Sequence, residues 1–133
     1  MLSPEEQKTL ESYANIAKER AKTHSDPNVW RAEFGEFRKL LSQGSIIDIG
    51  CGSGRDAPLF IEAVYEYVGV DLSSEMIASA RKFAPKAAFC EGDMYALPFP
   101  NDFFDGFWAS ASLLHIPKRS VVKVFEEIKR VVK

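Results

Sequence analysis

The sequence predicts an α/β fold in which one parallel sheet is covered by helices. After residue 44, short apolar runs alternate with segments of helical periodicity. Parallel strands need crossover connections, and the crossover helices cover both faces of the sheet. Acidic or small residues directly follow the apolar runs, at the strand ends where such sheets bind ligands.

The first part of the chain, 1–44, is predicted to be a helical cap. Ser3 can cap a helix whose apolar stripe runs to about His24. Asp26-Pro27 starts a second helix, and Gly44 is placed to stop it. Four apolar residues mark the buried face of this second helix: Trp30, Phe34, Phe37 and Leu41.

The remainder, 45–133, is predicted to form the sheet and its helices within the same compact domain. The expected strands are 45–49, 67–70 (ending at Asp71), 87–90 and 104–109. The expected helices are Arg55–Tyr65, one capped by Ser73, and a last one lined by Val121, Val124, Phe125, Ile128 and Val132. Alternation along the fourth strand places Phe107 in the core, with Phe103 or Phe104 sealing the sheet end.

Composition argues against several classes of function. The net charge is −2 and the basic residues are scattered, which disfavours nucleic-acid binding. No apolar run approaches the ~20 residues of a membrane span, and the polar N-terminus does not resemble a signal peptide. Cys51 and Cys90 are expected to be reduced thiols of a cytoplasmic protein. No His/Cys/Asp cluster has metal-ligand spacing, so no metal is expected.

A glycine string follows the first strand, with the pattern D-x-G-x-G-x-G from Asp48 to Gly54. Glycines let the backbone turn tightly and approach a ligand closely. The third glycine of a dinucleotide fingerprint would fall on Arg55, and no P-loop lysine follows. An acid two residues before the first glycine repels a pyrophosphate but suits a ligand that carries positive charge.

The other strand ends carry matching groups. Asp71 ends the second strand, 21 residues after Gly50, where an acid can accept hydrogen bonds from both ribose hydroxyls. Asp93 follows the third strand, and the fourth ends in small residues near Ala109 that allow close approach of a ligand.

Taken in order, these segments resemble the successive motifs of class I S-adenosylmethionine-dependent methyltransferases. The matching segments are Asp48–Asp56, Val70–Ser73, Glu91–Met94 and Phe104–His115. The resemblance runs from about Tyr13 to the chain end. It implies a Rossmann-like sheet of strand order 3-2-1-4, with the family's fifth to seventh strands missing.

For the methionine end of the cofactor, the resemblance implies contacts from the loop that contains Gly50, Cys51, Gly52 and Gly54. Asp48 matches the acid that reaches the cofactor's ammonium, often through water, and the Ala109 carbonyl matches a second acceptor for it. An N-terminal helix covers the cofactor in related enzymes, often with a tyrosine like Tyr13, and Arg31 is a weaker candidate there.

For the nucleoside end, the resemblance implies that Asp71 binds the ribose and that Leu72 lies beside the adenine. Asp93 matches the residue that accepts from the adenine amino group. The Met94 N–H matches the donor that faces a ring nitrogen.

Structural roles compete with several of these assignments. Asp71 and Asp93 can be a helix cap and a turn residue, while Asp56 and Glu91 are expected to be solvated. Cys51 is expected to be a small buried filler rather than a nucleophile. His115 can be a general base or a structural histidine. Tyr13, Trp30 and the phenylalanines from Phe99 to Phe107 can simply pack on the sheet.

The leading hypothesis is a methyltransferase that acts on a small-molecule acceptor. The alternative is a non-catalytic cofactor-binding module that needs a partner chain to complete its substrate site, and an NAD enzyme is disfavoured by Asp48 and Arg55. An uncovered fourth-strand edge would invite a homodimer or a partner chain, together with the last helix.

Overall fold

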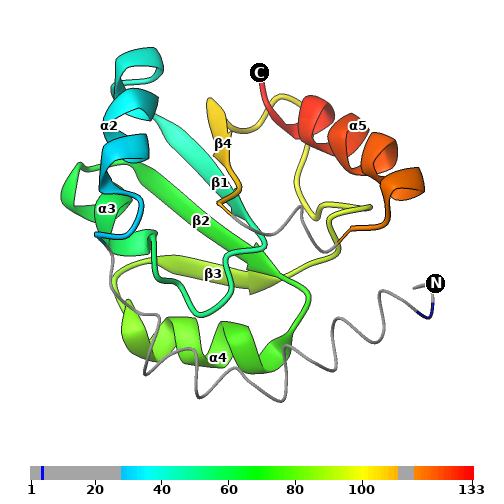
Figure 1. Cartoon of the computed structure of the whole chain (residues 1–133), viewed down its shortest axis with the longest axis horizontal. Coiled ribbons are helices and arrows are strands. Elements are labelled where there is room, and N and C mark those ends of the chain that lie inside the picture. The colour runs from blue at the N-terminus through cyan, green and yellow to red at the C-terminus, as the bar shows by residue number, and fades with distance from the viewer. Residues whose placement is uncertain (1–3, 5–27, 111–115) are drawn as a thin grey trace.

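The computed structural model describes residue 4 and residues 28–110 and 116–133 of the chain. One parallel sheet has the strand order β3-β2-β1-β4 (Figure 1). Its strands are β1 (Ser45–Ile49), β2 (Glu66–Asp71), β3 (Ala88–Glu91) and β4 (Gly106–Trp108). The helices are α2 (Arg31–Leu40), α3 (Ala57–Glu62), α4 (Ser74–Phe83), the 3-10 turn η2 (Lys118–Ser120) and α5 (Val121–Val131). The predicted α/β fold and its strand order are confirmed.

Of the predicted helical cap, the structure describes residue 4 and the segment from residue 28, which contains α2. The predicted first helix lies outside the described residues, so the division at residue 44 stays a prediction. Among the described helices, none combines the length and the apolar character that crossing a bilayer requires.

The two faces of the sheet carry different cores, because successive strand residues point to opposite sides. Ile46 of β1 faces α2, α3 and α4, where the Phe60 ring lies 4.8–5.6 Å from four other aromatic rings. We call this side, with Phe34, Phe60, Tyr65, Tyr67 and Trp108, the aromatic face. Ile47 and Ile49 point the other way, toward α5 on the opposite side of the sheet (Figure 1). We call that side, with Val70, Val124, Ile128 and Val131, the aliphatic face.

Helix α4 begins as predicted. The Ser73 side chain accepts a hydrogen bond from the Met76 amide at 3.2 Å, which satisfies one of the free N–H groups of the first turn. Met76, Ile77 and Ala80 are buried, as their helical spacing predicts. This cap fixes the chain direction immediately after the end of β2.

The predicted bounds of two helices are wrong. Helix α3 is shorter than Arg55–Tyr65, because the chain first makes a turn through Asp56 and Val64 then leaves the helix at φ 64°. Gly44 does not stop α2, which ends four residues earlier, where the Leu41 carbonyl accepts from the Tyr65 hydroxyl. Gly44 instead allows the close approach of Asp105, whose carboxylate would lie 2.5 Å from a Cβ at this position.

Strand β4 is shorter than predicted, and its alternation is the reverse of the expected one. Trp108 pairs with Asp48 in the register, lies on the aromatic face and is 9% exposed, whereas Phe107 is 36% exposed at the sheet edge. The prediction that Phe107 lies in the core is therefore wrong. Phe104 does seal the sheet end, since it is 1% exposed and forms a bridge with Val132.

Helix α5 buries Val124, Ile128 and Val131 against the aliphatic face. The expected stripe is therefore only partly correct. Phe125 is 42% exposed, and Val132 lies beyond the helix.

Candidate functional site: the strand ends around the glycine loop

The glycine loop leaves β1 in a series of left-handed turns. Gly50, Gly52 and Gly54 have φ values of 67°, 58° and 81°, a region that residues with a side chain rarely adopt. The Cys51 amide donates to the Val70 carbonyl at 3.0 Å, so the loop continues beside β2 after β1 has ended. The glycine pattern is thus required by the backbone itself.

Gly52 and Gly54 have different surroundings. A Cβ on Gly54 would lie 3.1 Å from the Ala80 Cβ and from the tip of the Phe89 ring, so the loop packs tightly there against α4 and β3. Among the described residues, a Cβ on Gly52 would meet only the Met76 sulfur, at 4.0 Å. No other described residue crowds the backbone at Gly52, whereas Gly54 is tightly packed.

Asp71 joins the end of β2 to this loop. Its carboxylate accepts from the Gly52 amide at 3.0 Å and from the Ser73 amide at 2.9 Å, and the residue is 3% exposed. The structure therefore brings Gly52 and Asp71 into direct contact, which the sequence pattern alone did not predict. The backbone carbonyl of Asp71 also accepts from the Gly92 amide at 3.1 Å, which places the start of the next loop beside it.

Asp48 lies on the aromatic face beneath the loop and is 2% exposed. The Tyr67 hydroxyl donates to its carboxyl group at 2.6 Å. Burial raises the pKa of Asp48 from 3.8 to about 8; the nearby acids Asp56 and Asp71 add to this increase, and the hydrogen bond from Tyr67 opposes it. At neutral pH the carboxyl group is mainly protonated, and a cation placed beside it would favour its ionised form. Contact between Asp48 and a bound ammonium group stays a prediction.

Asp93 organises a tight turn after β3. Its carboxylate accepts from the Tyr95 amide at 2.9 Å, and its backbone carbonyl accepts from the Ala96 amide at 3.0 Å. Asp93 thus has the turn role that competed with ligand binding, and it is only half-buried. Met94 is half-buried beside it.

Two of the remaining predicted contact residues, Leu72 and Ala109, lie at the same sheet edge. Leu72 follows Asp71 and is half-buried. Ala109 follows Trp108, which pairs with Asp48, and it packs partly on the aliphatic face. Arg31 is exposed and donates to Asn28 at 2.6 Å. Tyr13 and His115 lie outside the described residues.

The sequence analysis did not predict the ion pair between Arg55 and Asp56 beside the loop. Asp56 is 4% exposed, so the prediction that it is solvated is wrong. It accepts from the Trp108 indole N–H at 3.0 Å and from Arg55 Nε at 3.0 Å. A tryptophan at a strand end was the available signal, because a buried indole N–H needs an acceptor.

Arg55 connects this pair to the end of β4. Its Nη2 atom donates to the Ser110 hydroxyl at 3.3 Å, and its guanidinium carbon lies 5.8 Å from the centre of the Trp30 ring. The Trp30 indole N–H is buried and has no acceptor among the described residues. Trp30 therefore packs beside the loop, although its polar atom has no structural partner there.

Cys51 is half-buried, and Cys90 lies on strand β3, which β2 separates from β1. Desolvation, together with the negative charges of Asp48 and Asp71, raises the pKa of the Cys51 thiol well above its ordinary value. A thiol in this state is a poor nucleophile, which supports the interpretation of Cys51 as a small filler. Glu91 is exposed, as expected.

Comparisons with known proteins agree with this geometry. Residues 46–133 match the family model described as "Methyltransferase domain". The uncharacterised methyltransferase YcgJ of Bacillus subtilis is 36% identical over 93 residues, which are 66% of this chain and 36% of YcgJ. The 2-methyl-6-phytyl-1,4-hydroquinone methyltransferase of Synechocystis is 28% identical over 106 residues, 77% of this chain and 33% of that enzyme.

Solved structures show the same fold. The PH0226 protein of Pyrococcus horikoshii superposes with a TM-score of 0.73 at 30% identity, over 78% of this chain and 48% of that one. The structure of Bacillus subtilis YcgJ superposes with a TM-score of 0.68 at 32% identity, over 77% of this chain and 47% of that one. The chain thus spans about a third of the two curated relatives and about half of each of these two structures. It belongs to the methyltransferase-domain family, the class I methyltransferases whose cofactor is S-adenosylmethionine.

Proposed function

We propose that this chain binds S-adenosylmethionine along the carboxyl ends of β1, β2 and β3 and transfers its methyl group to a small-molecule acceptor. One observation carries the proposal. The Asp71 carboxylate accepts from the amide of the left-handed Gly52, which no described residue crowds, at the strand ends where parallel sheets bind nucleoside ligands.

The residues present fit the cofactor. The loop Gly50–Gly54, including Cys51, would follow the methionine portion, with Asp48 and the Ala109 carbonyl near its ammonium. Asp48 supports this assignment, because its raised pKa means that a nearby positive charge would stabilise its ionised form.

At the nucleoside end, Asp71 would bind the ribose hydroxyls and Leu72 would contact the adenine. The Asp93 carboxylate would accept from the adenine amino group, and the Met94 N–H would face a ring nitrogen. The Tyr95 amide bonds to one carboxylate oxygen of Asp93. The other oxygen has no hydrogen bond among the described residues, which suits this role. Tyr13 would cover the cofactor from the N-terminal segment.

Methyl transfer from this cofactor needs few catalytic groups from the protein. The cofactor supplies an activated methyl group, so the chain's own task is to orient the two reactants and to exclude water from them. His115 would act as a general base only for an acceptor that must lose a proton. A small acceptor is supported by the net charge of −2, which offers no basic footprint, and by the hydroquinone named for the Synechocystis relative.

Ligand binding tests the cofactor assignment. We expect S-adenosylhomocysteine at 100 times its Kd to stabilise the wild-type chain by roughly 2.7 kcal/mol in a thermal-shift titration. Asp71→Asn should weaken binding about tenfold or more, ~1.4 kcal/mol, because it removes the charged acceptor. The control is Asp102→Asn, an exposed aspartate away from the strand ends. No stabilisation of the wild type, or displacement of the ligand by NAD, would overturn the assignment.

Turnover is tested separately with labelled S-adenosylmethionine and a panel of small phenolic, amine and carboxylate acceptors. Label transfer that depends on Asp71 supports an enzyme. Tight binding without transfer to any acceptor would instead favour the non-catalytic module.

We further propose that the outer edge of β4 is a partner surface, for a second copy or another chain. Among the described residues, the C-terminal residues 130–133 pair with residues 102–104, before the strand begins, and no pairing with β4 itself is found beyond that with β1. Phe107 is 36% exposed on β4, while α5 exposes Val122 and Phe125. Sedimentation at micromolar concentration should detect self-association that Phe107→Lys reduces, and a strictly monomeric wild type would count against a homodimer.

A further inference from the structure

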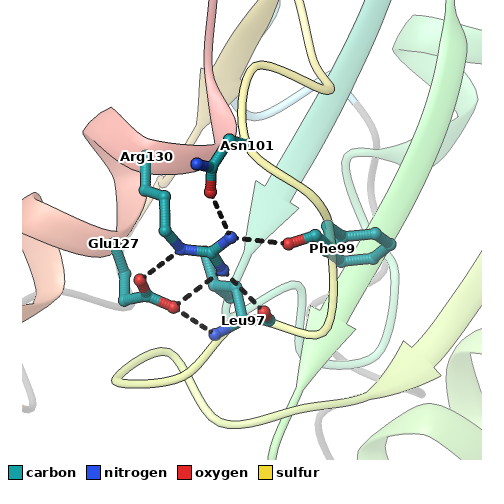
Figure 2. Close-up of polar contacts among 5 residues, drawn as sticks. All are labelled: Leu97, Phe99, Asn101, Glu127 and Arg130. Carbon is teal, nitrogen blue, oxygen red and sulfur yellow. Dashed lines mark hydrogen bonds and ion pairs between the residues drawn. The ribbon is translucent and has the colours of Figure 1, made fainter.

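The loop after β3 is fastened to α5 by one pair of charged residues, which Figure 2 shows. Arg130 donates to the Leu97 carbonyl at 2.9 Å, to the Phe99 carbonyl at 2.8 Å and to the Asn101 side chain at 3.0 Å. All three nitrogens of the guanidinium group have acceptors, because Glu127 takes the remaining bonds at 2.6 and 3.0 Å.

Glu127 has a second partner in the same loop. Its carboxylate accepts from the Leu97 amide at 2.7 Å. The backbone of Leu97 is therefore held at both of its polar groups, by Glu127 through the N–H and by Arg130 through the carbonyl. The hydrogen bonds from Arg130 lower the pKa of Glu127, so the carboxylate stays ionised at neutral pH.

Leu97 directly follows the turn 93–96, which contains the two residues assigned to the adenine. The other end of this turn is attached to β2, since the Gly92 amide donates to the Asp71 carbonyl at 3.1 Å. A Cβ on Gly92 would lie 2.9 Å from Val70 and 3.1 Å from Pro98, so this end is also tightly packed. The turn is thus held between β2 on one side and α5 on the other.

We infer that Glu127 and Arg130 are positioning residues that set the adenine selectivity of the turn 93–96. The inference rests on the proposed function. It adds α5 to the elements that determine adenine selectivity. Neither side chain needs to touch the ligand. They fix the backbone from which the Asp93 carboxylate and the Met94 N–H would recognise the edge of the base.

The geometry requires an arginine at this position. A planar guanidinium can donate to three loop acceptors and one carboxylate at once, whereas a lysine ammonium has three donors at a single point. The pair is also partly exposed, with side-chain exposures of 32% for Arg130 and 18% for Glu127. Such pairs add little to global stability, so their loss should act mainly on the loop.

Two ligands that differ only at the base provide the test. S-adenosylhomocysteine and S-inosylhomocysteine share the amino acid and the ribose, but hypoxanthine replaces the 6-amino group with a carbonyl and protonates N1. The full wild-type chain should bind the adenine form about tenfold or more tightly in calorimetry, ~1.4 kcal/mol. In Arg130→Lys, this preference should fall to about threefold or less, mostly through weaker binding of the adenine form.

Two further variants sharpen the result. Glu127→Gln keeps an acceptor for the Leu97 amide but loses the charge that holds Arg130, so its preference should be intermediate. Lys129→Met removes an exposed cation from the same helix and should keep the wild-type preference. If Arg130→Lys does not fold, Glu127→Gln carries the test alone.

The outcomes separate the two proposals. A wild type that binds neither ligand, or binds both equally, contradicts the adenine assignment, and the inference falls with it. A selective wild type whose selectivity survives in Arg130→Lys and Glu127→Gln contradicts the inference alone. An equal loss of affinity for both ligands indicates a merely structural role and also overturns it.

Discussion

The aromatic and aliphatic faces of the sheet use the same strands for different purposes. The aromatic face holds two buried carboxyl groups, Asp48 and Asp56, each with a hydrogen-bond donor from Tyr67 or Trp108. The buried members of the aliphatic face, from Ile47 to Val131, are hydrocarbon side chains. Burying carboxyl groups is costly even when they are hydrogen-bonded, whereas burying hydrocarbon stabilises the fold. Among the described residues, the aromatic face thus combines an apolar core with buried carboxyl groups beside the glycine loop, whereas the aliphatic face buries hydrocarbon side chains.

The largest expected effect is a loss of packing on the aliphatic face. Ile128→Ala should lower the free energy of unfolding by ~2–5 kcal/mol, because Ile128 is 2% exposed and its removal leaves a cavity. Urea denaturation measures this loss. Val122→Ala, at a residue that is 65% exposed on the same helix, should stay within about 0.5 kcal/mol of the wild type. Equal effects of the two substitutions would contradict the assigned packing.

An intermediate effect is expected where the aromatic face pairs its polar groups. Asp56→Ala should cost ~1–3 kcal/mol, because the buried Trp108 indole and Arg55 Nε both lose their acceptor. The near-ultraviolet circular dichroism of the tryptophans should change with it. Glu62→Ala, at an exposed position in the helix that follows Asp56, is the matched control. A fully stable Asp56→Ala variant would show that this pairing is dispensable.

The smallest expected effect is a gain in stability. The pKa of Asp48 is raised from 3.8 to about 8, so the fold is favoured most below pH 4 and loses this contribution as the pH rises toward 8. Asp48→Asn cannot ionise, and it should be more stable than the wild type at pH 8 by ~0.5–2 kcal/mol, with a flatter pH profile. Urea midpoints at pH 5 and pH 8 measure this difference.

The same Asp48→Asn variant should bind S-adenosylhomocysteine more weakly, because it has no charge to offer an ammonium group. A gain in stability with a loss of affinity would identify Asp48 as a residue that is kept for the ligand. Parallel pH profiles for the variant and the wild type would contradict the buried, protonated carboxyl group.

The features that sequence could predict are those fixed by local chemistry. The β-branched run 45–49 forms β1 with the predicted bounds, and Ser73 caps α4, because each depends on a few neighbouring residues. The glycine string was also predictable as a loop, because closely spaced glycines favour tight turns with positive φ, as observed at Gly50, Gly52 and Gly54.

Features that depend on contacts between residues distant in sequence could not be predicted from local patterns. The face that Phe107 occupies is set by the register of β4 against β1, and that register is a tertiary property. Asp56 is buried only because Trp108, 52 residues away, brings an indole N–H to it. The contact between Asp71 and the Gly52 amide likewise requires β1 and β2 to be neighbours. Local patterns could place these acids at strand ends but could not name their partners.

The attachment of Leu97 to α5 also has a kinetic consequence. An amide in an irregular loop usually exchanges its hydrogen with solvent quickly, but this one is bonded to a helix side chain across 30 residues of sequence. We expect its exchange to be slower than that of an unbonded loop amide, because the bond to Glu127 must break before the hydrogen can exchange. This bond couples the turn to the helix, although the two are distant in sequence.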